Sequence, residues 1–136
     1  IDAFHLPVTN VLAGVPNTDF YAPGSLLAVT LDRASPLTAG VTAPVPAVWF
    51  EASPAFQIAD PTRARAVVRY PSTGDPLLSG WLLGGSTLND KAAMVDVSMG
   101  RGHVVLYGFR PQYRGQSMAT EPLIWGAIRQ APAGGR

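Results

Sequence analysis

The sequence predicts an α/β or α+β domain that consists mostly of strands, with a mixed sheet and one helix at its C-terminal end. Short apolar segments alternate with turns rich in proline and glycine along most of the 136 residues. One segment, His103–Phe109, is almost free of charge. Only the last segment has the apolar period of a helix. The length and the hydrophobic content of 47% suit a single domain, residues 1–136, with one core.

The N-terminal residues are expected to form little regular structure. Residues 1–5 have the pattern of a last helical turn, and Leu6-Pro7 ends it because the residue before a proline avoids the helical conformation. Because the chain begins inside this turn, we interpret it as the C-terminal part of a larger polypeptide. Val8–Pro23 is predicted to be a packed loop with one turn at Pro16–Asp19.

The next part of the chain is predicted to contain four strands. Gly24–Leu31 is apolar on both sides, which favours a strand buried on both faces. The turn Asp32–Pro36 follows it, and then come the apolar strand Ala47–Phe50 and a brief pairing segment at Ala55–Ile58. Arg63–Tyr70 alternates between apolar and basic residues, so its arginine face is expected in solvent.

The strongest local prediction is a hairpin in the second half of the chain. Leu77–Leu83 is predicted as a strand, and Lys91–Met99 alternates between apolar and polar residues. Gly100–Gly102 supplies the turn that leads into His103–Phe109. Because this last segment is apolar on both faces, we expect it in the middle of the sheet.

A helix is predicted from Glu121 to Gln130. Thr120 suits the N-cap position, Glu121 favours the first turn, and Pro122 is tolerated there. The residues expected to face inward are Leu123, Ile124, Ala127 and Ile128.

Composition excludes several classes of function. The formal net charge is +1 and only 14% of residues are charged, so we expect no nucleic-acid partner. No apolar run approaches the roughly 20 residues that span a bilayer, so we expect no membrane segment. The low charge is compatible with a surface covered by another protein or with many loops, given 13 prolines and 14 glycines.

The tryptophans lie within apolar segments and are expected in the core or in an interface: Trp49, Trp81 and Trp125.

The chain has no recognisable catalytic set, and we expect neither a catalytic residue nor a metal ligand in it. There is no cysteine, and neither His5 nor His103 is followed by glutamate three positions later. Gly24-Ser25 and Gly85-Ser86 lack the Gly-x-Ser-x-Gly spacing of a nucleophile elbow.

The loop between the last strand and the helix is the one candidate binding site. Two guanidinium groups, a phenol and two amides stand directly before the helix, where free N–H groups attract anions. This arrangement suits a carboxylate or phosphate ligand. The candidate residues are Arg110, Gln112, Tyr113, Arg114 and Gln116.

A structural role for the same loop is the alternative. In that case the two arginines hydrogen-bond to loop carbonyls and pair with acidic side chains, which pins the loop to its sheet. The acidic candidates are Glu51, Asp75 and Asp96.

Three segments resemble a known family. They are Gly100–Gln116 (GRGHVVLYGFRPQYRGQ), Asp75–Leu83 (DPLLSGWLL) and Phe20–Ser25 (FYAPGS). Together they look like the C-terminal region of large bacterial zinc carboxypeptidase-like metallopeptidases, and the similarity spans about residues 6–128. In such proteins this region resembles a class I glutamine amidotransferase-like domain of flavodoxin-like fold.

The resemblance implies an accessory role rather than catalysis by this piece. The family binds zinc through a His-x-x-Glu pair and a later histidine in a preceding domain, and nothing here matches those residues, so zinc is implied only for that missing domain. The cysteine that amidotransfer requires is absent too. We therefore expect a non-catalytic accessory or assembly domain that contacts the rest of its parent polypeptide. Because the apolar sheet has only one predicted helix to cover it, we also expect the chain to form homo-oligomers. The alternative is a module that binds a small molecule or a peptide carboxylate through Arg110 and Arg114. The compartment stays open, and a secreted or periplasmic parent is compatible with the sequence.

Overall fold

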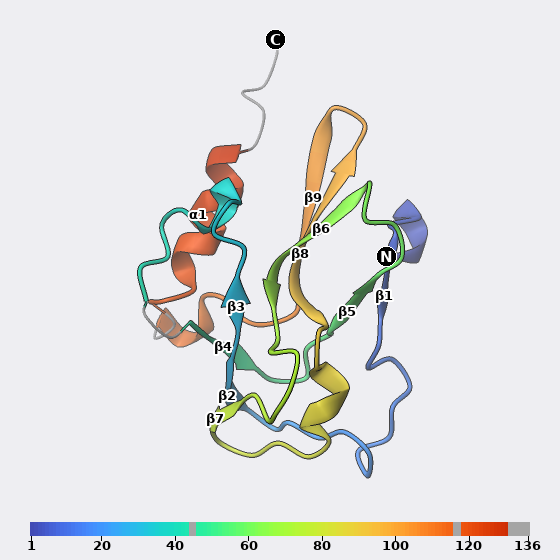
Figure 1. Cartoon of the computed structure of the whole chain (residues 1–136), viewed down its shortest axis with the longest axis vertical. Helices are drawn as coiled ribbons and strands as arrows, with labels where there is room; N and C mark the ends of the chain where they lie inside the picture. Colours follow the sequence, from blue (N-terminus) through green and yellow to red (C-terminus); the bar gives the residue numbers. More distant parts are fainter. Residues whose placement is uncertain (44–45, 116–117, 131–136) are drawn as a thin grey trace.

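The computed structural model describes residues 1–43, 46–115 and 118–130, which form two antiparallel sheets and one C-terminal helix (Figure 1). The fold is therefore of the α+β type and mostly strand. The larger sheet contains β1 (Val8–Asn10), β3 (Thr30–Leu31), β5 (Phe56–Ile58), β6 (Ala64–Arg69), β8 (Ala92–Met99) and β9 (Gly102–Tyr107). Its strand order is β1-β5-β8-β6-β3, and β9 lies beside β8.

The smaller sheet has the order β4-β2-β7. Its strands are β2 (Ser25–Ala28), β4 (Ala47–Phe50) and β7 (Leu77–Ser79). The helical elements are the short 3₁₀ turns η1 (Asp2–Phe4), η2 (Pro36–Thr38), η3 (Gly85–Leu88) and η4 (Tyr113–Gly115), and the helix α1 (Glu121–Gln130).

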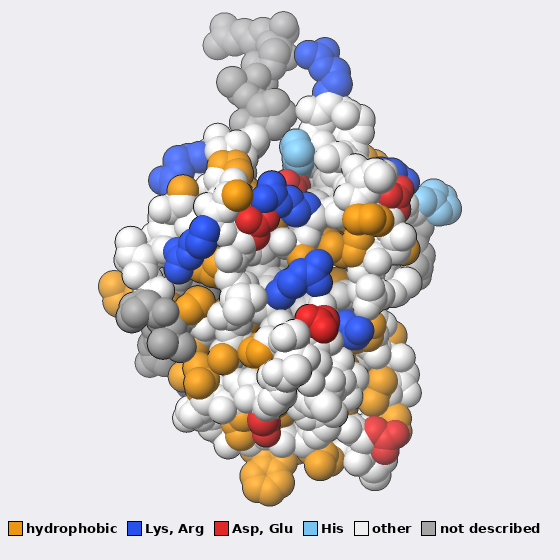
Figure 2. Space-filling view, viewed as in Figure 1, with side chains coloured by type: hydrophobic (Ala, Val, Ile, Leu, Met, Phe, Trp, Pro, Cys, Tyr) orange, Lys and Arg blue, Asp and Glu red, His pale blue; other side chains and the backbone are white. Residues whose placement is uncertain are grey.

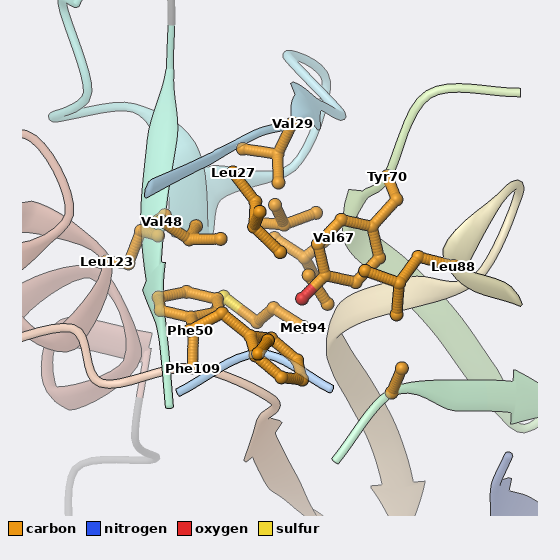
Figure 3. Packing of buried hydrophobic residues seen from close by; sticks show 14 of the residues in the cluster. Leu27, Val29, Val48, Phe50, Val67, Tyr70, Leu88, Met94, Phe109 and Leu123 are labelled. Atoms are coloured by element: carbon orange, nitrogen blue, oxygen red, sulfur yellow. The ribbon is translucent and has the colours of Figure 1, made fainter. Parts of the chain in front are cut away.

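Two apolar clusters fill the interior. The larger one lies between the two sheets and α1, and it includes Leu27, Phe50 and Met94 (Figure 3). The smaller one covers the other face of the larger sheet and includes Val8, Phe56 and further residues of β8. Each cluster contains fully buried side chains, so β8 is covered on both of its faces.

Several sequence predictions are confirmed. The strand β4 has the predicted bounds, the hairpin of β8 and β9 turns where expected, and α1 begins and ends at the predicted residues. The turn before Phe20 also forms, since the Asp19 N–H donates to the Pro16 carbonyl over 2.9 Å.

The predicted mixed sheet is wrong, because every strand pair in the described part of the chain is antiparallel. Parallel neighbours need a long crossover, usually a helix. Here the ten-residue helix α1 follows the last strand, so it connects no two strands of the sheets.

The predicted strand Gly24–Leu31 is in fact two strands in different sheets. The chain leaves β2 at Ala28 and enters β3 at Thr30, and the Val29 N–H between them donates to the Pro46 carbonyl. The predicted loop Val8–Pro23 also begins with a strand, β1, which pairs with β5. Three residues are too few to show a period of two in the sequence.

The predicted central position of His103–Phe109 is wrong. In the part of the chain that the structure describes, β9 pairs with β8 alone, and most of its side chains are half-buried. The buried central strand is β8 instead, with burial along nearly its whole length. The apolar pattern of β9 thus belongs to an edge strand.

Register shifts explain why the alternation predicted for Arg63–Tyr70 fails. The pairing of β6 with β8 shifts on both sides of Val68. As a result Val67 and Val68 are both buried, although they are neighbours in the sequence. The arginines of β6 are exposed, as the alternation predicted.

The inward stripe predicted for α1 is only partly right. Leu123 is buried, but Ile128 is 57% exposed, and the buried glycine of the helix, Gly126, faces η2. A Cβ on Gly126 would lie 2.4 Å from the Leu37 carbonyl oxygen. The helix α1 packs closely against η2 at this glycine. In that orientation of the helix, Ile128 faces solvent.

Two tyrosine hydroxyls provide a paired test of this packing. The Tyr70 hydroxyl is buried and has no hydrogen-bond partner among the described residues, whereas the Tyr107 hydroxyl donates to the Leu123 carbonyl over 3.1 Å. Burial raises the pKa of both groups, so both stay protonated donors at neutral pH.

We predict opposite effects for the matched substitutions at these positions. Tyr70→Phe removes an unsatisfied buried donor and should raise the free energy of unfolding by about 1 kcal/mol, while Tyr107→Phe should lower it by about 1 kcal/mol. Urea denaturation of the two variants and the parent chain measures both. A loss of stability in Tyr70→Phe would show that its hydroxyl is satisfied in solution.

Candidate docking surface

The outer face of the smaller sheet presents apolar side chains to solvent. Leu26 and Trp49 are direct cross-strand partners on this face, whereas Leu27 and Val48 point into the core. Leu26 is 38% exposed and Leu78, on the neighbouring strand β7, is 51% exposed. In Figure 2, hydrophobic side chains are scattered over the visible face, including its lower left, where Figure 1 shows these strands.

Two glycines allow the backbone to pass close to this face. Gly24 has φ 147°, and a Cβ there would lie 3.0 Å from the Trp49 ring. Gly80 has φ 102°, and its Cβ would lie 2.8 Å from the Gly24 carbonyl oxygen. Next to it the buried Ser25 hydroxyl donates to the Trp81 carbonyl over 2.5 Å and accepts from the Trp81 N–H over 3.1 Å. These two hydrogen bonds hold the backbone of Trp81 in place.

The loop after β9 closes over one end of the same face. The Tyr113 ring stacks on the Trp49 ring with centroids 4.5 Å apart and an interplanar angle of 11°. The Arg110 N–H donates to the Trp49 carbonyl over 3.0 Å. This bond attaches the backbone of the loop to the outer edge of β4. Stacked aromatic pairs stabilise by about 0.5–1.5 kcal/mol beyond the area that they bury. The loop is thus attached to β4 at two points.

Charged groups surround the aromatic stack. The Arg110 Nη1 lies 3.0 Å from the Glu51 Oε2, which also accepts from the Trp49 Nε1 over 3.3 Å. The Arg114 guanidinium lies 5.2 Å from the centre of the Tyr113 ring, within the range of a cation–π contact. Arg114 itself has φ 50°, a left-handed conformation that is uncommon outside glycine.

The structure therefore brings three of the five predicted site residues together: Arg110, Tyr113 and Arg114. Gln112 is exposed next to them. Gln116 lies outside the described residues. Of the predicted acidic partners, Glu51 pairs with Arg110. Asp75 instead accepts from the Leu77 N–H, and Asp96 pairs with His103 over 2.9 Å.

The tryptophans were expected in the core or in an interface, and the structure places none of the three in the core of this chain. Trp49 is half-buried and stacked, but Trp81 is 64% exposed and Trp125 52% exposed, so neither belongs to the core of this chain. The sequence missed Trp49 and Leu26 as site residues. No sequence signal distinguished them, because their buried neighbours in β2 and β4, such as Leu27 and Val48, are equally apolar.

A cleft of about 830 Å³ lies beside Glu51. The segments around residues 10–17, 20–23 and 50–54 form its walls, with Phe20 and Phe50 on the apolar side. Ala52 at its rim has φ 45°. Its polar lining residues include Asn10, whose side-chain oxygen accepts from the Leu12 and Ala55 N–H groups. That oxygen is therefore occupied in holding the two walls together.

In the described residues there is no group of three or more histidine, aspartate or glutamate side chains placed to hold a metal ion. Within the same residues no helix has the length and apolar character needed to cross a membrane.

Comparisons with protein-family models, with curated protein sequences and with solved structures found no match to this chain.

The aromatic stack can be tested by a double-mutant cycle. We expect Trp49→Ala and Tyr113→Ala each to lower the free energy of unfolding, with a coupling energy of about 0.5–1.5 kcal/mol between them. Arg110→Ala should cost less than about 1 kcal/mol, because its ion pair with Glu51 is half-exposed. Denaturant unfolding of the four chains of the cycle and of Arg110→Ala gives these values. Additive effects at positions 49 and 113 would contradict the stacking.

Proposed function

We propose that this chain is a non-catalytic accessory domain that docks onto the rest of a zinc carboxypeptidase-like parent protein through the outer face of its smaller sheet. The observation that carries this proposal is the composition of that face. It has an exposed apolar centre in Leu26 and Leu78 and an aromatic stack at one end, and arginines flank the stack. Tryptophan, tyrosine and arginine are the residues that dominate binding energy at protein interfaces.

The relation to a class I glutamine amidotransferase-like, flavodoxin-like domain is part of this proposal. It rests on the three resembling segments. Two of them adjoin or contribute to the docking face: Phe20–Ser25 leads into β2, and Asp75–Leu83 contains β7 with Leu78. The third contains β9 and the loop with Tyr113. Of the residues named on the proposed docking face, Leu78, Tyr113 and the two arginines lie within the resembling segments, whereas Leu26 and Trp49 lie outside them.

The docking proposal is tested by charge substitutions on the face. Leu26→Glu combined with Leu78→Glu should weaken binding of this chain to the metallopeptidase region of its parent by at least about tenfold, since buried charges without a partner are costly. Met99→Glu is the matched control, because Met99 is similarly exposed, at 42%, but lies at the end of β8 in the other sheet. Titration calorimetry measures the three affinities. Equal affinities would place the interface elsewhere.

We also predict that the isolated chain neither retains zinc nor hydrolyses peptides. The reason is chemical: the sequence offers two histidines without the partner spacing of a zinc site, and no activated nucleophile. Elemental analysis and a peptidase assay on the purified chain check this. Stoichiometric zinc with activity that follows the zinc content would overturn the non-catalytic assignment.

Binding of a peptide or small-molecule carboxylate is a second candidate function. It is favoured by the Arg110–Glu51 pair, in which the guanidinium already holds a carboxylate of the chain itself at a half-exposed position. A ligand carboxylate would have to replace that of Glu51. Glu51→Gln should therefore strengthen binding of an acidic peptide if this candidate is right. Unchanged or undetectable binding in the variant would favour the purely structural role of Arg110.

A further inference from the structure

The strand β9 has one backbone edge without a strand beside it in the described part of the chain. Its register with β8 is regular over six residue pairs, from Met94 opposite Tyr107 to Met99 opposite Gly102. On the same side of β8, β5 pairs only at Ala92, beyond the end of β9. Among the described residues, no strand pairs with the far edge of β9.

One hydrogen bond fixes which backbone groups face that edge. The Gly108 N–H donates to the Ala93 carbonyl over 2.7 Å. Because hydrogen-bonded pairs alternate along an antiparallel ladder, Leu106, Val104 and Gly102 are the residues of β9 that exchange bonds with β8. The N–H and C=O groups of the intervening residues therefore point away from β8: His103, Val105 and Tyr107.

The side chains of β9 do not protect this edge. Natural edge strands are usually shielded by lysines, prolines, bulges or covering elements. The sequence of β9 is Gly-His-Val-Val-Leu-Tyr, and its ladder has no register shift. Val104 and Leu106 pack on the smaller cluster, while Val105 and Tyr107 pack on the larger one. All four are only half-buried. Both faces of the strand are therefore apolar, as in a strand that has neighbours on both sides.

We propose that a second copy of this chain pairs with β9 through its own β9, antiparallel and about a two-fold axis at Val105. A strand added there would turn the edge strand into an interior one. The free backbone groups match in this register: Val105 faces Val105 of the second copy, and His103 faces Tyr107 of the second copy. Each facing pair exchanges both N–H···O=C bonds.

The side chains also suit this register. On the face of the smaller cluster, Val104 lies opposite Leu106 of the second copy, an apolar pair in both directions of the two-fold. On the other face, His103 lies opposite a neutral tyrosine, and within its own chain its Nδ1 already contacts the Asp96 carboxylate at 2.9 Å. No like charges are brought into opposition. Since only one short strand pair carries the contact, the dimer is weak and depends on concentration.

The proposed contact lies on a different strand from those of the docking surface. The hairpin of β8 and β9 extends to the end of the molecule opposite β2 and β7 (Figure 1). The dimer does not depend on the proposed docking to a parent protein, and it is measured on this chain alone. Failure of either proposal therefore leaves the other standing.

Sedimentation velocity of the unmodified chain is the first test. The average mass should rise from 14.3 kDa toward twice that value as the concentration increases. Amide exchange followed by NMR should slow with concentration at Val105, whose N–H faces the free edge, and stay constant at Val104, which is bonded to β8. A monomer at every concentration would overturn the proposal.

Cysteine crosslinking tests the register, because the chain has no cysteine of its own. Val105→Cys places two thiols at the facing position, where the Cα atoms of a hydrogen-bonded pair are about 5.5 Å apart, within the range of a disulfide. His103→Cys is the matched control. Its two thiols would be four residues out of register, about 13 Å apart along the strands.

Mild oxidation should therefore give a disulfide-linked dimer at least about tenfold faster for Val105→Cys than for His103→Cys, although position 103 is the more exposed one. Equal rates, or faster crosslinking at position 103, would overturn pairing through β9 in this register. Sedimentation of each reduced variant shows whether it still associates.

Discussion

The burial of β8 on both faces is the constraint on which the rest of the structure depends. Ala93 and Met94 belong to the larger apolar cluster, and Val95 and Val97 to the smaller one. A strand with two apolar faces requires cover on both sides. The smaller sheet and α1 provide it on one face, and on the other face β8 packs in the smaller cluster with side chains such as Leu6 and Val8.

Close backbone approaches connect β8 to the docking surface. The chain leaves β9 at Gly108, where a Cβ would lie 2.3 Å from the Pro54 carbonyl oxygen, so no larger residue fits. Phe109 then enters the larger cluster, and the next N–H bonds to the edge of β4. The loop that carries Tyr113 is thereby fixed at its first residues by the core itself. Its stacking on Trp49 uses a position that core packing has already determined.

Local sequence patterns correctly predicted the elements that are determined by residues close together in the sequence. The hairpin of β8 and β9 has its turn glycines between two apolar runs, and α1 has a first-turn acid and a helical period after a threonine of the type that favours the N-cap position. The division of Gly24–Leu31 was not predictable in this way, because Val29 is apolar and no proline or glycine marks the bend. Tertiary contacts decide there: the Val29 N–H bonds to Pro46, a residue of a distant segment.

The candidate site shows the same division between local and tertiary information. Arg110 and Tyr113 were predictable from a polar run between a strand and a helix, and Glu51 was among the acidic partners considered. Trp49 was expected in the core or in an interface, because an apolar tetrapeptide does not show which of its faces is covered. The same ambiguity affected β9, which has the composition of a central strand but lies at an edge. A sequence pattern reports how much apolar cover a strand requires, and only the assembled molecule determines whether the same chain or another one supplies it.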